Sequence, residues 1–250
     1  MRRTIGGTGK RMKRRVGILG GMGPQATILI MQKLLAGVQA QDDADHIPLI
    51  IDQNTQVPSR IRHLLEGGGE DPGPVLADMA RRLVAGGAEA LAMPCNTAHH
   101  YAGAIRAAVT VPFLDMVAIS IAHAAKLAGQ GGIVGILASP AVRKVGLFDA
   151  GLAKHGLRAI YAPDEAAMLA AIRQIKAHGP QPLARATLKA ASEDMLAKGA
   201  AVQMIACTEF SLIADAVAPK ITSFDTLDLL VRAITEFALR QDAKVEQVAV

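Results

Sequence analysis

The chain has 250 residues, of which 51% are hydrophobic and 3% aromatic, with two cysteines and no tryptophan. This length can bury a substantial core in one large or two small domains, and so few aromatic side chains argue against a surface that stacks nucleic-acid bases. The formal net charge of +5 arises in residues 1–15, which hold seven positive and no acidic side chains. The rest of the chain is mildly acidic, so we expect no nucleic-acid partner.

Residues 1–14 form a basic segment whose composition is typical of a flexible tail. It lacks the apolar stretch of a signal peptide, and no later run is long and apolar enough to span a membrane. We therefore expect a cytoplasmic protein with no membrane partner, in which both cysteines are reduced thiols.

The first half alternates short apolar runs with helical patterns. We expect strands at 15–19, 48–52, 88–93 and 111–116, and helices at 24–38, 75–85, 97–108 and 117–127. The glycine-rich segment 66–74 is expected to be a flexible loop, either a lid or a tolerated connection.

The turn after the first strand reads GGMGP, at positions 20–24. Glycine lets the backbone approach a ligand closely, and the helix N-terminus that follows can bind an anion. The spacing differs from the dinucleotide fingerprint, because proline replaces a donor and no acidic residue closes a second strand at the usual distance. NAD binding is not expected.

The second half repeats the alternation. We expect strands at 133–137, 157–161, 201–206 and 221–224, and helices at 142–155, 164–178, 182–198, 209–216 and 226–240. Continuous apolar strands separated by helices are typical of parallel sheets covered on both faces. The predicted fold is α/β with two Rossmann-like domains, residues 15–116 together with 222–242, and residues 117–221.

Two sequence features occur in both halves. The letters VGIL occur at 16–19 and again at 134–137, and a cysteine follows a Gly-Ala pair by the same interval, Gly87 to Cys95 and Gly199 to Cys207. An internal duplication with a pseudo-two-fold axis explains both features. The alternative is that two α/β halves share strand and turn chemistry through composition alone.

Cys95 and Cys207 each end a predicted strand and precede polar residues. A pseudo-two-fold axis would place both thiols at the cleft between the domains, on opposite sides of one ligand. That arrangement can invert a stereocentre, because one thiolate takes a proton while the other thiol supplies one, and a thiol pKa of about 8.5 is easily tuned towards neutrality. Donors for the developing enolate-like charge are expected among Asn54, Asn96, Thr97 and Thr208.

Other interpretations of these residues stay open. Either cysteine alone is more often a packing residue. His99 and His100 follow Cys95, yet they give no second cluster with metal-ligand spacing, so we expect hydrogen-bonded structural histidines and no metal site. Ser139 lacks the surroundings of a hydrolase nucleophile.

Arg60 lies in the polar loop that follows the second strand, where an open parallel sheet places its ligand. Its planar guanidinium matches a carboxylate. A surface arginine is the equally simple alternative.

Several segments together resemble a known family, the cofactor-independent aspartate/glutamate racemases. They are VGILGGMGPQAT, the stretch from Asn54 to PSR, PCNTAHH, VPFLDM, VGILAS and ACTEF, which span nearly the whole chain after the tail. The resemblance implies two Rossmann-like domains with the active site in the cleft between them, no pyridoxal phosphate, no metal and a homodimer.

The resemblance also implies roles for individual residues. Cys95 and Cys207 match the two bases of the family, Arg60 its loop arginine and, less closely, Lys176 its late lysine. The expected contacts to a small amino-acid substrate are Met22, Asn54, Arg60, Asn96, Thr97, Thr208, Glu209 and Lys176. Departures from the family pattern are Pro94, Ala206 and Ser59, and they leave the side-chain preference open.

The expected activity is therefore racemisation of aspartate or glutamate by proton transfer between two cysteines. The resemblance extends to hydantoin racemases and to maleate cis–trans isomerases, in which one cysteine adds to the double bond. Arylmalonate decarboxylases are disfavoured because they need only one of the two cysteines. A protein that binds an amino acid without turning it over is the non-enzymatic alternative.

Overall fold

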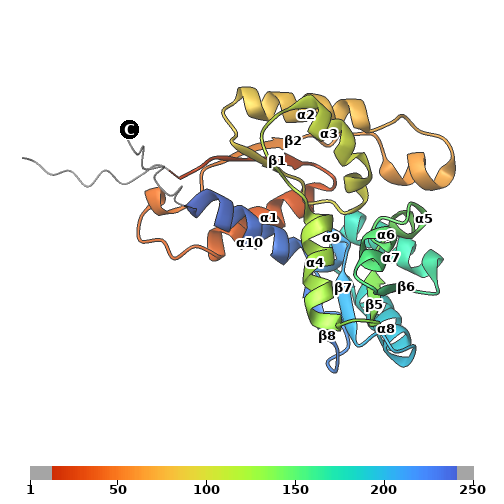
Figure 1. Cartoon of the computed structure of the whole chain (residues 1–250). Coiled ribbons are helices and arrows are strands. Elements are labelled where there is room, and N and C mark those ends of the chain that lie inside the picture. The colour runs from red at the N-terminus through yellow and green to blue at the C-terminus, as the bar shows by residue number, and fades with distance from the viewer. Residues whose placement is uncertain (1–12, 241–250) are drawn as a thin grey trace, which may run out of the picture.

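The computed structural model describes residues 13–240 (Figure 1). Most of the expected tail, 1–14, and the last residues of the expected 222–242 segment lie outside this range. Lys13 and Arg14 correct the tail boundary, because they pack on the folded body. The ammonium of Lys13 lies 3.3 Å from the carbonyl oxygen of Ala44, and the backbone amide of Arg14 donates a hydrogen bond to the carbonyl oxygen of Ala238 at 3.2 Å.

Two four-stranded parallel sheets form the framework. The first has the order β2-β1-β3-β4 and the second the order β6-β5-β7-β8. The strands are β1 (Val16–Gly20), β2 (Leu49–Gln53), β3 (Ala90–Ala92), β4 (Phe113–Leu114), β5 (Ile133–Leu137), β6 (Arg158–Tyr161), β7 (Val202–Ile205) and β8 (Thr222–Asp225). Each strand therefore has a counterpart at the same place in the other sheet, which confirms the predicted α/β fold with two similar halves.

Helices follow the strands in both halves. They are α1 (Pro24–Ala36), α2 (Gly73–Ala85), α3 (Ala102–Ala108), α4 (Met116–Ala128), α5 (Pro140–Lys144), α6 (Asp149–Lys154), α7 (Glu165–His178), α8 (Pro182–Ala197), α9 (Thr208–Ser211) and α10 (Thr226–Leu239). Shorter helical turns are η1 (Asp43–Asp45), η2 (Arg62–Glu66), η3 (Thr97–Tyr101) and η4 (Ala214–Ala216). None of the helices within residues 13–240 has the length and apolarity needed to cross a membrane.

The helix after the fourth strand of each half packs on the other half. Helix α10 leaves the second sheet after β8, and its Leu230 and Ile234 join the core around β1; in Figure 1 it lies beside α1. Helix α4 leaves the first sheet, and Val117 and Ala124 pack in the core around β5. The expected return of 222–242 to the first domain therefore needs correction, because β8 pairs with β7 and the return begins at α10.

The turn between β1 and α1 packs directly against the backbone that follows β2. Gly21 has a φ of +89°, and a Cβ atom there would lie 2.3 Å from the carbonyl oxygen of Asn54, so only glycine fits. The hydroxyl of Thr27, in the first helical turn of α1, accepts a hydrogen bond from the amide of Gly21 at 2.9 Å. This bond fixes the β1–α1 turn against the start of the helix. The loop that follows β2 is thereby fixed at the carboxyl edge of the sheet.

Three expected elements differ from the structure. The helix predicted at 142–155 is two helices, α5 and α6, because Gly146 takes a φ of +59° between them and the buried side chain of Phe148 anchors the turn. The helix predicted at 209–216 ends at Ser211 and is followed by η4, and the helix predicted at 97–108 begins with the 3-10 turn η3. The π-helical turn η2 precedes the expected loop 66–74 and overlaps it only at Glu66.

Candidate active site

The two cysteine motifs meet where the carboxyl ends of the two sheets face each other. Cys95 follows β3 and Cys207 follows β7, and both are free thiols with 8% and 7% of their surface exposed. The hydroxyl of Thr208 donates a hydrogen bond of 2.9 Å to the carbonyl oxygen of Pro94. Since each of these residues adjoins one of the cysteines, the two motifs are in direct contact although 112 positions separate the thiols in the sequence.

A second contact joins the halves beside the first. The hydroxyls of Thr97 and Ser139 lie 3.1 Å apart, and Ser139 follows β5, at the place that the GGMGP turn occupies after β1. At the surface, Arg173 of α7 pairs with Glu66 of η2 at 2.8 Å. The site is therefore bordered by side chains from both halves.

Charged groups gather around Cys207. The carboxylate of Glu209, 8% exposed, accepts a hydrogen bond from the Cys207 thiol at 3.1 Å and pairs with the Lys176 ammonium at 3.2 Å. Burial disfavours the charge on Lys176, yet the Glu209 carboxylate and then the thiols of Cys95 and Cys207 raise its pKa above the ordinary value, while Arg60 opposes this. Both thiols, the Glu209 carboxylate and the Arg60 guanidinium therefore lie within electrostatic range of the Lys176 ammonium group.

Asn96 is almost fully buried, and its orientation follows from its neighbour. The hydroxyl hydrogen of Thr226 goes to the carbonyl oxygen of Ile205 at 3.0 Å, so this hydroxyl can only accept from the side-chain amide of Asn96, also at 3.0 Å. The amide nitrogen of Asn96 is thus engaged. Its Oδ1 atom has no hydrogen-bond partner among residues 13–240 and remains an available acceptor.

His99 holds the Cys95 loop in place. Its Nε2 atom accepts from the amide of Met116 at 3.2 Å, so Nδ1 carries the hydrogen and donates to the Cys95 carbonyl oxygen at 2.8 Å. Burial lowers the pKa of His99, which keeps the ring neutral. The expectation of a hydrogen-bonded structural histidine is confirmed for His99, whereas His100 is exposed and its ring packs edge-on against Tyr101.

The residues expected from the first turn and the β2 loop border the same region. Met22 is buried and packs in one core cluster with Val57 and Cys95. The side-chain Oδ1 atom of Asn54 is used locally, because it accepts a hydrogen bond from the backbone amide of Gln56 at 2.9 Å. Arg60 donates one nitrogen to the carbonyl oxygens of Val57 and Pro58, at 3.2 and 2.9 Å. These contacts fix the loop, and Arg60 lies within electrostatic range of Lys176.

Thr208 departs from its expected role as a hydroxyl donor. Its hydroxyl hydrogen is already given to Pro94, so the donor it can offer a ligand is the backbone amide at the first position of α9. Asn96 differs in the same way, because its amide hydrogens face Thr226. Both hydrogen bonds join residues that lie far apart in the chain, so no local sequence pattern reveals them.

Sequence reasoning missed two residues that the structure brings to the site, Ser139 and Thr226. The repeated VGIL letters could have indicated Ser139, since they place it opposite the GGMGP turn. Thr226 carries no such signal, because it reaches Asn96 only through the crossing of α10 to the first half.

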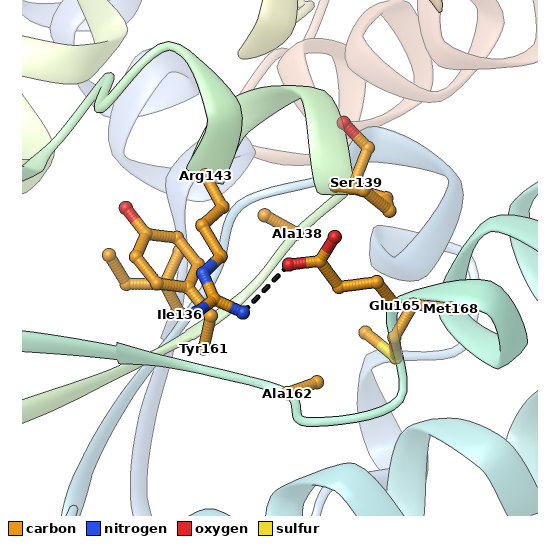
Figure 2. Close-up of a pocket in the computed structure, with 9 residues that line it drawn as sticks. Ile136, Ala138, Ser139, Arg143, Tyr161, Ala162, Glu165 and Met168 are labelled. Carbon is orange, nitrogen blue, oxygen red and sulfur yellow. Dashed lines mark hydrogen bonds and ion pairs between the residues drawn. The ribbon is translucent and has the colours of Figure 1, made fainter. Parts of the chain in front are cut away.

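A separate small pocket lies at the carboxyl ends of β5 and β6, and its cavity volume of about 10 Å³ leaves space for little more than one water molecule (Figure 2). Arg143 of α5 and Glu165 of α7 meet in it as an ion pair of 2.7 Å. Figure 2 shows the Ser139 hydroxyl pointing away from this pair, which fits its contact with Thr97. Arg143 and Glu165 neutralise each other in this pocket. The Ser139 hydroxyl faces Thr97 and the cysteine motifs instead.

No group of three His, Cys, Asp or Glu side chains within the described range could hold a metal ion. The side chains that converge are two thiols, one carboxylate, two cations and an amide acceptor. Such a set suits proton transfer on a small charged molecule.

This fold and site define a class of protein. The sequence pattern of the Asp/Glu/hydantoin racemase family matches residues 19–234, and the chain belongs to that family. The broad specificity amino-acid racemase RacX of Bacillus subtilis is 31% identical over 137 residues, which cover 52% of this chain and 59% of that protein. The chain thus matches little more than half the length of this curated relative.

Solved structures show the same fold. An aspartate racemase of Picrophilus torridus superimposes with a TM-score of 0.79 at 24% identity, covering 90% of this chain and 94% of that one. An aspartate racemase homologue of Pyrococcus horikoshii OT3 gives 0.70 at 20% identity and covers 91% and 100%. The glutamate racemase isoform RacE1 of Bacillus anthracis gives 0.62 at 15% identity and covers 90% and 81%.

Proposed function

We propose that the protein is an amino-acid racemase that acts on aspartate, or on glutamate, by proton transfer between Cys95 and Cys207. The observation that carries the proposal is the hydrogen bond between Thr208 and Pro94, which joins the two cysteine motifs from opposite halves. Family membership supports racemisation as the reaction. The charges around Lys176 support an acidic substrate.

In this reaction one thiolate takes the hydrogen from Cα while the other thiol delivers a hydrogen to the opposite face. The electron pair left on Cα spreads into the substrate carboxylate, and that charge needs donors that are already in place. Backbone amides at the starts of η3 and α9 are available for it, because the first amides of a helix have no partner within the helix.

The substrate's fixed charges match the remaining groups. Aspartate carries two carboxylates and one ammonium, and the cations Arg60 and Lys176 complement the carboxylates. The unpaired Oδ1 atom of Asn96 is a buried acceptor, which suits a hydrogen of the substrate ammonium. We assign Asn96 this role instead of the carboxylate contact that its motif implied.

The test is racemisation by the purified protein, followed by chiral chromatography of L- and D-aspartate and of both glutamate enantiomers. Cys95→Ser and Cys207→Ser should each lower kcat by at least about 100-fold, the usual contribution of a general acid or base. Glu165→Gln, whose charge pairs with Arg143 outside the cleft, should keep normal activity. Binding of aspartate without turnover would identify a binding protein, and conversion of maleate to fumarate in place of racemisation would identify the isomerase.

We also propose that the enzyme is a homodimer, as the family resemblance implies. Sedimentation velocity at micromolar concentration should give twice the 26.1 kDa mass of the chain. A sedimenting species with the mass of one chain across the concentration range would contradict the dimer.

A further inference from the structure

The carboxylate of Glu209 lies between Cys207 and Lys176, and the other half of the molecule has nothing equivalent. One oxygen accepts from the Cys207 thiol at 3.1 Å and the other lies 3.2 Å from the Lys176 ammonium. The residue at the matching position after Cys95 is Thr97, whose hydroxyl pairs with Ser139. The pseudo-symmetry of the fold therefore breaks at the two thiols.

Several features place positive charge beside the Glu209 carboxylate. Lys176 pairs with it directly. Its Oε1 atom also approaches the N-terminus of α1, since a Cβ atom built on Gly23 would lie 3.6 Å from it. The positive end of a helix dipole stabilises a carboxylate. Helix α1 has thirteen residues and no acidic side chain in its first turn to oppose this effect.

The Glu209 carboxylate stabilises the protonated form of the neighbouring Cys207 thiol. Burial, then the charge of Glu209 and the hydrogen bond to it, raise the pKa of Cys207 well above the ordinary value, although Lys176 and the backbone amide of Glu209 act in the opposite direction. The charged or titratable groups that face this thiol and its ammonium partner come from four segments: Glu209, Lys176 of α7, Arg60 of the β2 loop, and Cys95.

We infer that Glu209 keeps the hydrogen on Cys207 in the substrate-free protein, so that Cys95 is the thiol that ionises first. This inference rests on the proposed function and names the direction of its first step. The Cys95 thiolate takes the Cα hydrogen, and the C–H electron pair passes into the substrate. The Cys207 S–H bond then breaks and its hydrogen goes to the opposite face of Cα. The Cys207 thiolate that results adjoins the Glu209 carboxylate, and this repulsion favours recovery of a proton from water, while the Cys95 thiol releases to water the proton that it took from Cα, which restores the starting state for the next turnover.

Alkylation of the native protein by iodoacetamide, without substrate, tests the inference. A thiolate displaces iodide and forms a thioether, so the pH dependence of the rate reports ionisation of each thiol, and peptide mass spectrometry separates Cys95 from Cys207. The two thiols are almost equally exposed, so access does not favour either. We expect Cys95 to react at a lower pH than Cys207.

Two substitutions should move the midpoint of Cys207 in opposite directions. Glu209→Gln removes the charge at similar size and should lower the midpoint by about one pH unit or more, which is tenfold more thiolate at a fixed pH. Lys176→Gln should raise it, and Glu209→Asp, which keeps the charge, should stay nearer the native value than Glu209→Gln. Glu165→Gln, which removes an equally charged group paired outside the cleft, should leave it unchanged.

The inference is overturned if Cys207 reacts at a lower pH than Cys95, or if the Cys207 midpoint is the same in the native protein and in both the Glu209→Gln and Lys176→Gln variants. Racemisation assays on the same preparations separate this result from the proposed function. Loss of turnover with shifted midpoints would leave the role of Glu209 intact, and turnover with unshifted midpoints would remove it.

Discussion

At the scale of single residues, the two halves place different chemistry at equivalent positions. His99 and Ser211 each lie four residues after a cysteine, and Asp115 and Asp225 each begin the helix that follows a fourth strand. In the first half, neutral His99 bridges Cys95 to α4. In the second half, the hydroxyl of Ser211 donates to Asp225 at 2.9 Å. The buried ring of His99 therefore has the buried hydroxyl of Ser211 as its counterpart.

Asp225 gives a pH-dependent prediction. Burial raises its pKa to about 6, although bonds from Leu227 and Ser211 to its Oδ1 atom partly oppose this. Because the native protein binds this proton more tightly than the unfolded chain, the stability that Asp225 contributes is complete below pH 4 and is lost as the pH rises to 6 and above. The loss is of the order of 3 kcal/mol, at about 1.4 kcal/mol per pH unit.

Asp225→Asn keeps an oxygen for both donors and removes the titration. The variant's stability relative to the native protein should therefore grow by about 2 to 3 kcal/mol between pH 4 and pH 7.5, measured by urea unfolding at both values. The comparison cancels His99, which both proteins share and whose lowered pKa makes stability fall in the opposite direction, as the pH drops below 6.5. A difference that is constant with pH would show that Asp225 is already ionised in the fold.

The sequence predicts much of the site at this scale and misses specific bonds. Both thiols, Arg60 and the polar residues that follow each cysteine could be selected because they follow strands at one edge of a sheet. The engaged hydrogens of Thr208 and Asn96 could not, because their partners Pro94 and Thr226 lie more than 100 positions away. Donor roles depend on such partners, and residue type alone leaves them open.

At the scale of elements, the turn between β1 and α1 determines where the loop after β2 lies. Gly21→Ala would combine a strained positive φ with a Cβ atom 2.3 Å from the Asn54 carbonyl oxygen. We expect a loss of at least about 2 kcal/mol in the free energy of unfolding, from the left-handed conformation and the clash together. The β2 loop that carries Arg60 should also shift, so KM for aspartate should rise.

Gly103→Ala is the matched control for this turn. Gly103 lies on the exposed side of α3, and a Cβ atom there would meet nothing within 4 Å. Alanine in a helix is favoured over glycine by about 0.5 to 1 kcal/mol, so this variant should be slightly more stable and equally active. Equal stability of the Gly21→Ala and native proteins in urea would mean that the turn does not require glycine.

Element boundaries follow the sequence well where periodicity is strong and poorly where a turn interrupts an apolar run. Helix α7 and strand β5 match their expected ranges to within one residue. The helix expected at 142–155 fails, because Gly146 and Phe148 make a turn inside a stretch that reads as one helical pattern. Strand β4 is two residues long because helix α4 already begins at Met116, where the carboxylate of Asp115 caps its first turn.

At the scale of the whole molecule, the crossing of α4 and α10 makes each half complete only with the other. The side chain of Met116 packs in the core of the first half, and that of Val117 packs in the core of the second. Leu230 of α10 closes the first core in the same way. The two halves should therefore unfold together, although each has its own sheet.

The chain's two tyrosines report on this cooperativity. Tyr101 packs in the first half and Tyr161 against the core of the second, and there is no tryptophan to obscure their fluorescence. Tyr161→Phe and Tyr101→Phe each leave one reporter. In each variant, the urea midpoint from tyrosine fluorescence should equal the midpoint from helical circular dichroism. Two separated midpoints in either variant would show that the halves unfold independently.

The strand order shared by the two sheets was predictable from the alternation of strands and helices and from the repeated VGIL letters. The packing of α4 and α10 on the opposite half was predictable only in part. Nothing in the periodicity of α10 says which sheet its apolar face covers, and the sequence misassigned β8 for that reason. The strand that each strand pairs with, and the sheet that each helix covers, are determined by the whole chain. The contact between the two cysteine motifs results from these choices.

The most direct test of the account is early turnover of L-aspartate in D₂O. If Cys95 and Cys207 act from opposite faces of Cα, the first D-aspartate formed carries deuterium at Cα, while the L-aspartate recovered at the same time still carries hydrogen. Mass spectrometry after chiral separation reads both pools. Deuterium in the recovered L-aspartate ahead of D-aspartate formation, or D-aspartate that has kept its hydrogen, would contradict transfer between two thiols.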